Sequence, residues 1–226
     1  MSEQYNFLDE NNQAGTSGLM YASEKGIPVM VMEPLRGGKI VNALPNEVNI
    51  IWNTAKPKRS AADWALRWVW NHPEAVLLLS GMGDEKQVEE NIRVASAAEA
   101  NSLSTEELEL FEQVKKILFA KIKVNCTTCG YCMSCPQGVD IPGCFSYYNE
   151  SFMRSGFLAK FGYMQNTGAI SKHPEYASLC KKCKMCEKHC PQGIPISQKL
   201  NEVAREMEGP IFKPMVSLAK FLMKVK

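Results

Sequence analysis

The sequence CTTCGYCMSCPQG, from Cys126 to Gly138, places four cysteines at intervals of three residues and follows the last one with proline. A near-copy, CKKCKMCEKHCPQG, runs from Cys180 to Gly193. Eight of the nine cysteines of this 226-residue chain fall in these two segments, which form its internal repeat. Where thiols stay reduced, cysteines grouped in this way indicate metal ligands rather than a disulfide framework.

The second segment has the spacing C-x₂-C-x₂-C-x₃-C-P. This run binds [4Fe–4S] clusters in bacterial two-cluster ferredoxins, where the fourth cysteine ligates the other cluster. Three thiolates on a tight turn can reach three irons of one cubane, whereas the fourth points away. The first segment departs from the run, with two residues instead of three before its last cysteine. The pattern predicts two clusters, one held by Cys126, Cys129, Cys132 and Cys190 and the other by Cys180, Cys183, Cys186 and Cys135.

A pair of Cys₄ zinc sites is the main alternative to iron–sulfur clusters. Structural zinc usually binds two C-x₂₋₄-C pairs separated by a longer loop, and evenly spaced triplets followed by Cys-Pro do not suit that arrangement. A disulfide framework is disfavoured in a reducing compartment. The ninth cysteine, Cys144, lies outside both segments, and we expect it to be a small buried apolar residue.

The net charge of +2 hides an asymmetry between the two halves. Residues 1–110 carry 9 Lys/Arg and 16 Asp/Glu, a net −7, whereas residues 111–226 carry 17 and 8, a net +9. Two oxidised cubanes with their cysteine ligands would each bring about −2. The lysines between the second group of cysteines would offset that charge. No recognition motif accompanies the basic half, so nucleic acid is not the expected partner.

The first 100 residues alternate short β-like runs with amphipathic helical segments. Strands are expected at residues 4–9, 28–33 and 75–80. Helices are expected at residues 17–25, after Ser60, and from Asp84 to Ala98. This alternation is typical of a parallel α/β fold.

The β-like runs end before the cysteine segments. A capping box of Ser104 and Glu107 begins a helix that leads into them. Residues 136–179 are expected to form short helices and turns, followed by helices at 196–208 and 215–224. The fold class is therefore α/β followed by a mostly α-helical domain. The boundaries that we expect are 1–100, a connecting helix at 101–122, and 123–226.

No apolar run approaches the roughly 20 residues that a membrane span needs, and the N-terminus MSEQYNFLDENNQ lacks the basic and apolar regions of a signal peptide. A cytoplasmic protein is expected. The basic, apolar segment IFKPMVSLAKFLMKVK (211–226) is expected to dock onto the protein's own core rather than onto a membrane.

The stretches QYNFLDENNQAG (4–15), GLMYASEKGIPVMVMEPLRGGKI (18–40) and WALRWVWNHPEAVLLLSGMGDEKQVEENIRVA (64–95) resemble the aldo/keto reductases. Together with the two cysteine segments, they resemble the bacterial branch that carries a C-terminal ferredoxin-like domain. The resemblance implies the last three β/α units of a (β/α)₈ barrel, with the first five strands missing from an N-terminally truncated member. The family's catalytic Asp, Tyr, Lys and His come from strands two to four, so the resemblance implies no catalytic residue here.

The resemblance also implies which residues would face NAD(P) in a full-length family member. They lie at the sixth strand and in the loops after the seventh and eighth strands: Gln4, Glu33, Arg36, Gly37, Gly38, Gly81, Met82, Gln87, Glu90 and Asn91. This sequence departs from the NADP-binding pattern, because Ser80, Gly81 and Met82 replace basic residues and Gln87 replaces arginine. Asp84 adds a negative charge at the helix start, so NADP preference is not expected.

These features predict an iron–sulfur oxidoreductase, or part of one, in which two [4Fe–4S] clusters transfer electrons. The alternative is a stand-alone ferredoxin-type electron carrier, or a partner-docking subunit without substrate chemistry of its own. The expected partners are a redox protein or the remaining part of the barrel.

Overall fold

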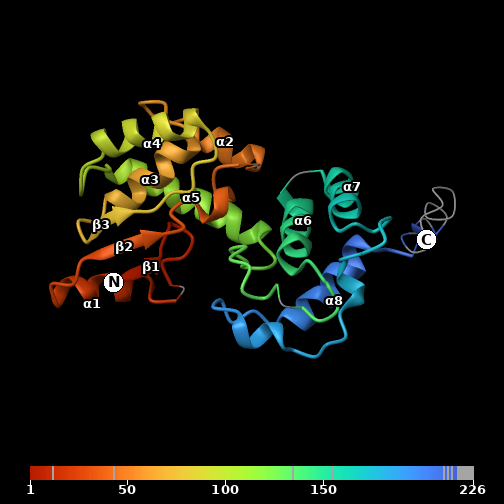
Figure 1. Ribbon diagram of the computed structural model, residues 1–226. Helices are drawn as coiled ribbons and strands as arrows, with labels where there is room; N and C mark the ends of the chain where they lie inside the picture. Colours follow the sequence, from red (N-terminus) through yellow and green to blue (C-terminus); the bar gives the residue numbers. More distant parts are fainter. Residues whose placement is uncertain are drawn as a thin grey trace. The chain divides into compact units, whose positions relative to one another are not determined.

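The computed structural model describes residues 1–11, 13–42, 44–133, 135–153, 155–210, 212, 214, 216 and 217. The chain divides into two compact units, Met1–Ala120 and Lys121–Lys226 (Figure 1). Most of the helix expected at residues 215–224, and most of the segment expected to dock onto the core, lie outside the described residues. None of the described helices is both long enough and apolar enough to traverse a bilayer.

A parallel three-stranded sheet organises the first unit, in the order β1-β2-β3. The strands are β1 (Ser2–Gln4), β2 (Val29–Met32) and β3 (Ala75–Leu78). β1 aligns Glu3 with Val31, and β2 aligns Val31 with Leu78. β2 and β3 lie within the ranges predicted for the second and third strands. The strand predicted at residues 4–9 overlaps β1 only at Gln4, so that prediction is wrong over residues 5–9. The result is a mixed helix and strand unit with a small parallel sheet.

Among the described residues of the first unit, six helical elements accompany this sheet. They are α1 (Gly15–Glu24), the 3₁₀ turn η1 (Arg36–Gly38), α2 (Asn46–Trp52), α3 (Ala61–Trp70), α4 (Glu85–Ala97) and α5 (Thr105–Lys121). Side-chain caps begin three of them. The side chains of Ser60, Asp84 and Ser104 accept hydrogen bonds from the amides of the residues three positions ahead. At α5 the box is reciprocal, because Glu107 Oε2 also accepts from the Ser104 amide.

The core of the first unit is an aromatic cluster centred on α5. The Phe111 ring lies 5.0 Å from Trp52, 5.4 Å from Phe7 and 5.8 Å from Trp64, measured between ring centroids. Trp52 and Trp64 stack at 5.0 Å. Large aromatic rings contribute most of the apolar area in such a core. The helix that the sequence suggests as a connection therefore forms part of the first unit.

The second unit contains three α-helices and two 3₁₀ turns among its described residues. These are α6 (Ile141–Met153), α7 (Gly156–Asn166), η2 (Ala177–Leu179), η3 (Cys186–His189) and α8 (Ile196–Met207). α8 buries Ile196, Leu200, Val203 and Met207, which recur at helical spacing. These side chains share one core with residues of α6 and α7, and several cysteines pack against it. The core thus lies directly behind the cysteine segments.

Candidate cluster sites and cofactor cavity

One small pocket of the second unit brings the two cysteine segments together. Three cysteines of the first segment line it with Cys190, the last cysteine of the second segment. Its other walls are mostly apolar and come from α6 and from the chain that leads into α8. The cysteines that line it are Cys126, Cys129, Cys132 and Cys190.

Cys186 lies near cysteines of both segments. Burial, together with the neighbouring Cys135 and Cys180, raises the pKa of its thiol to about 11. Cys183, by contrast, is exposed at the surface. The structure therefore gathers Cys135, Cys180 and Cys186, with Cys183 on the same loop. Among the described residues, no three His, Cys, Asp or Glu side chains converge as ligands of a single metal ion would.

The thiol of Cys132 is the most buried of the eight repeat cysteines. Burial, together with the nearby thiols of Cys126, Cys129 and Cys190, raises its pKa to about 12. A neutral thiol is favoured there because burial disfavours the charged form, and repulsion between neighbouring thiolates adds to this effect. A cationic group such as iron reverses the preference, since a metal-bound cysteine is deprotonated.

The two cysteine loops share one backbone conformation. The amide of Thr128 donates to Cys126 Sγ at 3.4 Å, and the amide of Lys182 donates to Cys180 Sγ at the same distance. Thr128 and Lys182 are both left-handed, with φ of 60° and 58°. Two residues further on, Gly130 and Lys184 are left-handed as well, with φ of 81° and 59°. The sequence repeat is therefore a structural repeat, in which amides point at cysteine sulfur.

Cys144 differs from the other eight cysteines. It is fully buried in α6, and its Sγ lies 3.9 Å from Tyr163 Oη and 3.8 Å from the Glu175 carbonyl. Burial strongly raises the pKa of this thiol. These surroundings are those of a core residue.

The first unit contains a cavity of about 430 Å³ at the carboxyl ends of β2 and β3. The predicted cofactor residues that line it are Glu33, Gly37, Gly38, Gly81, Gln87, Glu90 and Asn91. The remaining three lie elsewhere. Gln4 accepts a hydrogen bond from Gln13 Nε2 at 2.8 Å, and Met82 is exposed. Arg36 is buried and faces Asp9.

The loop after β2 is held by a buried polar network that the sequence did not reveal. Arg36 Nε lies 3.5 Å from Asp9 Oδ2, and the two side chains are 3% and 2% exposed. Asn6 Nδ2 donates to the same Asp9 oxygen at 2.8 Å and to the Glu33 carbonyl at 3.1 Å. Glu33, Arg36 and Gly37 have left-handed φ of 54°, 51° and 61°. The network fixes a strained loop that forms one wall of the cavity.

The opposite wall of the cavity is the start of α4. Gln87 uses its side chain locally: Oε1 accepts from the Gly83 amide at 2.9 Å, and Nε2 donates to Asp84 Oδ2 at 3.1 Å. Asn91 Nδ2 donates to Ser80 Oγ at 2.9 Å. No Lys or Arg lies among the described residues that line this cavity.

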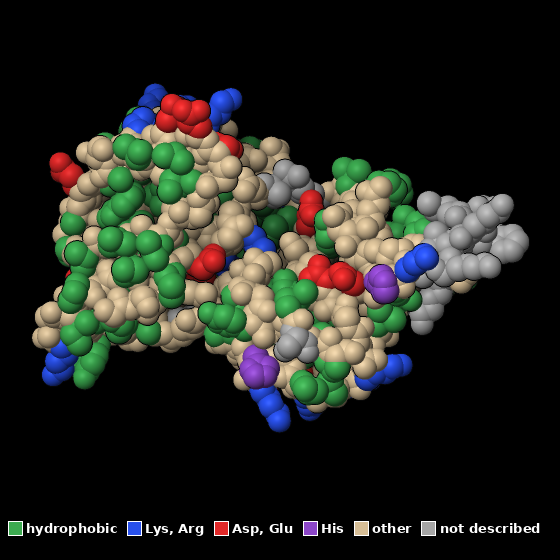
Figure 2. All heavy atoms as spheres, in the orientation of Figure 1, with side chains coloured by type: hydrophobic (Ala, Val, Ile, Leu, Met, Phe, Trp, Pro, Cys, Tyr) green, Lys and Arg blue, Asp and Glu red, His purple; other side chains and the backbone are tan. Residues whose placement is uncertain are grey.

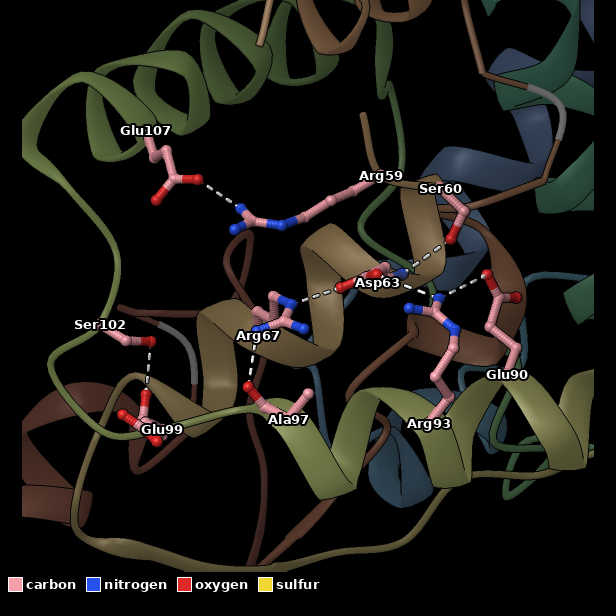
Figure 3. A network of polar contacts seen from close by, with 10 residues as sticks. All are labelled: Arg59, Ser60, Asp63, Arg67, Glu90, Arg93, Ala97, Glu99, Ser102 and Glu107. Carbon is pink, nitrogen blue, oxygen red and sulfur yellow. Dashed lines mark hydrogen bonds and ion pairs between the residues drawn. The ribbon is translucent and has the colours of Figure 1, made fainter. Parts of the chain in front are cut away.

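A charged network attaches α4 to α3 (Figure 3). Buried Asp63 accepts from Arg67 Nε at 2.6 Å and from Arg93 Nη2 at 3.1 Å. Figure 3 shows Arg93 reaching from α4 towards both Asp63 and Glu90. Arg59 pairs with Glu107 of α5. Because Glu90 also lines the cavity, this network fixes the helix that forms its wall.

Comparison with known proteins identifies both parts of the chain. Residues 1–116 match the aldo/keto reductase family, and residues 125–195 match the 4Fe-4S dicluster domain. No curated protein and no solved structure matches the chain. The two matches occur in the predicted order, which confirms the resemblance seen in the sequence. They identify an oxidoreductase-type protein with an iron–sulfur, ferredoxin-like domain. The chain belongs to the aldo/keto reductase family, and a 4Fe-4S dicluster domain follows its reductase part.

Proposed function

We propose that this chain is an electron-transfer oxidoreductase whose C-terminal unit holds two [4Fe–4S] clusters. The observation that carries the proposal is the shared pocket, in which Cys190 faces three cysteines from a segment more than fifty residues earlier. Crossed sets of this kind are typical of two-cluster ferredoxins. We assign Cys126, Cys129, Cys132 and Cys190 to one cluster and Cys180, Cys183, Cys186 and Cys135 to the other.

The residues around these cysteines suit such clusters. Thiolates are the ligands that iron–sulfur clusters take, and amides near the sulfurs stabilise the added negative charge. The left-handed turns at Thr128 and Lys182 supply amides of this kind. Apolar walls such as Ile141, Phe145 and Ile196 exclude water from the first set. When bound, each cluster supplies one-electron redox chemistry.

The proposed role of the first unit is to bind a nicotinamide dinucleotide in its cavity. Loops at the carboxyl ends of parallel strands and the start of a helix offer free amides to phosphate groups. We expect NAD rather than NADP, because Asp84 is near the cavity and no basic side chain lines it. The first unit would correspond to the last three β/α units of the family's barrel. It assigns no substrate chemistry to these residues, since the family's Asp, Tyr, Lys and His have no identified counterpart in them.

The cluster assignment is tested by anaerobic reconstitution with iron and sulfide. We expect about eight irons per chain and a brown protein with visible absorbance, reflecting two clusters of four irons each. Cys190→Ser should lower the iron content to about four per chain, whereas the matched control Cys144→Ser should keep about eight. A colourless protein, or one that contains zinc, would contradict the proposal.

The role of the first unit is tested on the reconstituted protein. If the unit delivers electrons, NADH should bleach the visible absorbance without a second protein, with an added flavin that splits its two electrons into single ones. Bleaching by dithionite but never by NADH would instead support the alternative, a ferredoxin-type carrier whose reductase part has no redox role.

A further inference from the structure

The loop between Cys180 and Cys190 presents an unusual surface. Four of its residues are exposed lysines, at positions 181, 182, 184 and 188. Between them lie exposed Cys183 and Met185, the latter with 52% of its surface accessible. Figure 2 shows Lys and Arg side chains along the lower edge of this unit, with no Asp or Glu beside them in this view. The surface therefore has Cys183 and the apolar side chain of Met185 at its centre, with basic neighbours.

The carboxylate of Glu187, which interacts with Lys184, offsets part of the basic charge of this loop. Glu187 is its one carboxylate, and its Oε1 atom accepts hydrogen bonds from the amide and hydroxyl of Ser197 at 2.9 and 2.6 Å. That carboxylate thereby holds the first turn of α8. Within the part of the chain that the structure describes, no salt bridge joins Lys181, Lys182 or Lys188 to a carboxylate.

The first cysteine loop is an internal control for the role of these lysines. It has the same left-handed positions, but Thr128 and Gly130 stand where the second loop has Lys182 and Lys184. No lysine lies between Cys126 and Cys135. If lysines were needed merely to balance the charge of a cluster, both loops would need them. Glycine adopts such left-handed positions without strain, so a lysine at position 184 costs free energy relative to glycine.

We infer that residues 181–188 form a docking surface for a small acidic one-electron carrier protein. Protein interfaces commonly place apolar side chains such as methionine at the centre and charges at the rim, which fits Met185 and its lysine neighbours. Complementary charge accelerates encounter and orients the partner. This inference rests on the proposed function, because the carrier would exchange electrons with the cluster assigned to this loop. In the forward direction the carrier loses one electron and the chain gains it.

The test measures electron transfer from a reduced flavodoxin, an acidic flavoprotein, to the reconstituted protein by stopped-flow absorbance. The second-order rate constant should fall about tenfold or more between roughly 20 mM and 0.5 M salt, because screening removes the attraction. The double variant Lys182→Gln/Lys184→Gln should slow transfer several-fold at low salt and flatten the salt dependence. The matched control, Lys123→Gln/Lys172→Gln, removes two exposed charges elsewhere in the unit and should change the rate less than twofold.

Failure of the docking surface is distinguishable from failure of the clusters. Iron content, the visible spectrum and reduction by dithionite report the clusters alone. Intact clusters with a rate that does not depend on salt, or that both double variants lower equally, would overturn the docking inference and leave the proposed function standing. Binding of anionic phospholipid vesicles that depends on Lys182 and Lys184, without an effect on the rate, would overturn it as well.

Discussion

The backbone amide of Lys182 donates a hydrogen bond to Cys180 Sγ, and Lys182 holds this amide in place with a left-handed φ of 58°. A residue with a Cβ atom adopts this conformation at a cost in free energy, whereas glycine adopts it freely. The hydrogen bond to Cys180 Sγ therefore depends on the Lys182 amide and on the left-handed conformation of this residue.

Lys182→Pro should abolish the second cluster, because proline lacks the amide and its φ is fixed near −65°. The iron content of the reconstituted protein should fall from about eight to about four per chain. Lys182→Gly is the matched variant: it keeps the amide and relieves strain, so iron content should stay near eight. Equal iron content in both variants would show that this amide is not needed.

Arg36 and Asp9 form a buried ion pair that joins the loops after β1 and β2. Asp9→Asn should destabilise the first unit by about 3–5 kcal/mol, because it leaves a guanidinium buried without its counter-charge. Urea unfolding followed by tryptophan fluorescence measures this, since all four tryptophans lie at positions 52–70.

The double variant Asp9→Asn/Arg36→Met removes both charges and should recover much of the lost stability. The free energy of unfolding of the double variant, compared with those of the two single variants, shows whether the two charges are coupled. If the double variant is as unstable as the sum of the two single variants, the pair is not coupled and our account of the loop is wrong.

The cysteine sites show what a sequence can predict. The spacing of the cysteines fixes local turns, and these turns repeat in the structure at Thr128 and Lys182. The capping residues Ser60, Asp84 and Ser104 likewise act within one helical turn and begin the expected helices. Features of this kind depend on neighbours in the chain, so the sequence carries them directly.

Features that depend on distant partners were not predictable in the same way. Arg36 looked like a residue for the cofactor, but its partner Asp9 lies 27 residues earlier and buries it. Helix α2 has only seven residues and no side-chain cap at Pro45, so its periodicity is too short to recognise. The sequence predicts helix α5 only as a connection, because nothing local indicates that Phe111 contacts three tryptophans.

The position of Phe111 predicts that α5 supports the first unit alone. Phe111→Ala should destabilise that unit by about 3–5 kcal/mol, because it leaves a cavity among the aromatic rings. The tryptophan-detected midpoint in urea should fall, while the iron content and the visible spectrum stay unchanged. Tyr131→Ala, which alters an exposed aromatic residue of the second unit, is the control and should leave the tryptophan-detected midpoint in place. Loss of clusters in Phe111→Ala would contradict this assignment of α5.

Glu3 makes the stability of the first unit depend on pH. Its side chain on β1 is buried, and neither carboxylate oxygen has a hydrogen-bond partner among the described residues. Burial raises the pKa of this carboxyl above its ordinary value of 4.5. The folded protein therefore holds the proton more firmly than the unfolded chain does. Stability from this group is fully present below about pH 4.5 and is lost as the pH rises through the folded pKa.

Glu3→Gln removes the charge while keeping the shape of the side chain. At pH 7–8 the variant should be more stable than the parent, because the parent must bury a charge or hold its proton more firmly than the unfolded chain does. The difference should disappear near pH 4, where the parent carboxyl is protonated as well. Glu99→Gln, at an exposed position, should shift the urea midpoint by little at any pH. A gain in Glu3→Gln that is the same at pH 4 and pH 8 would mean that titration of Glu3 is not its cause.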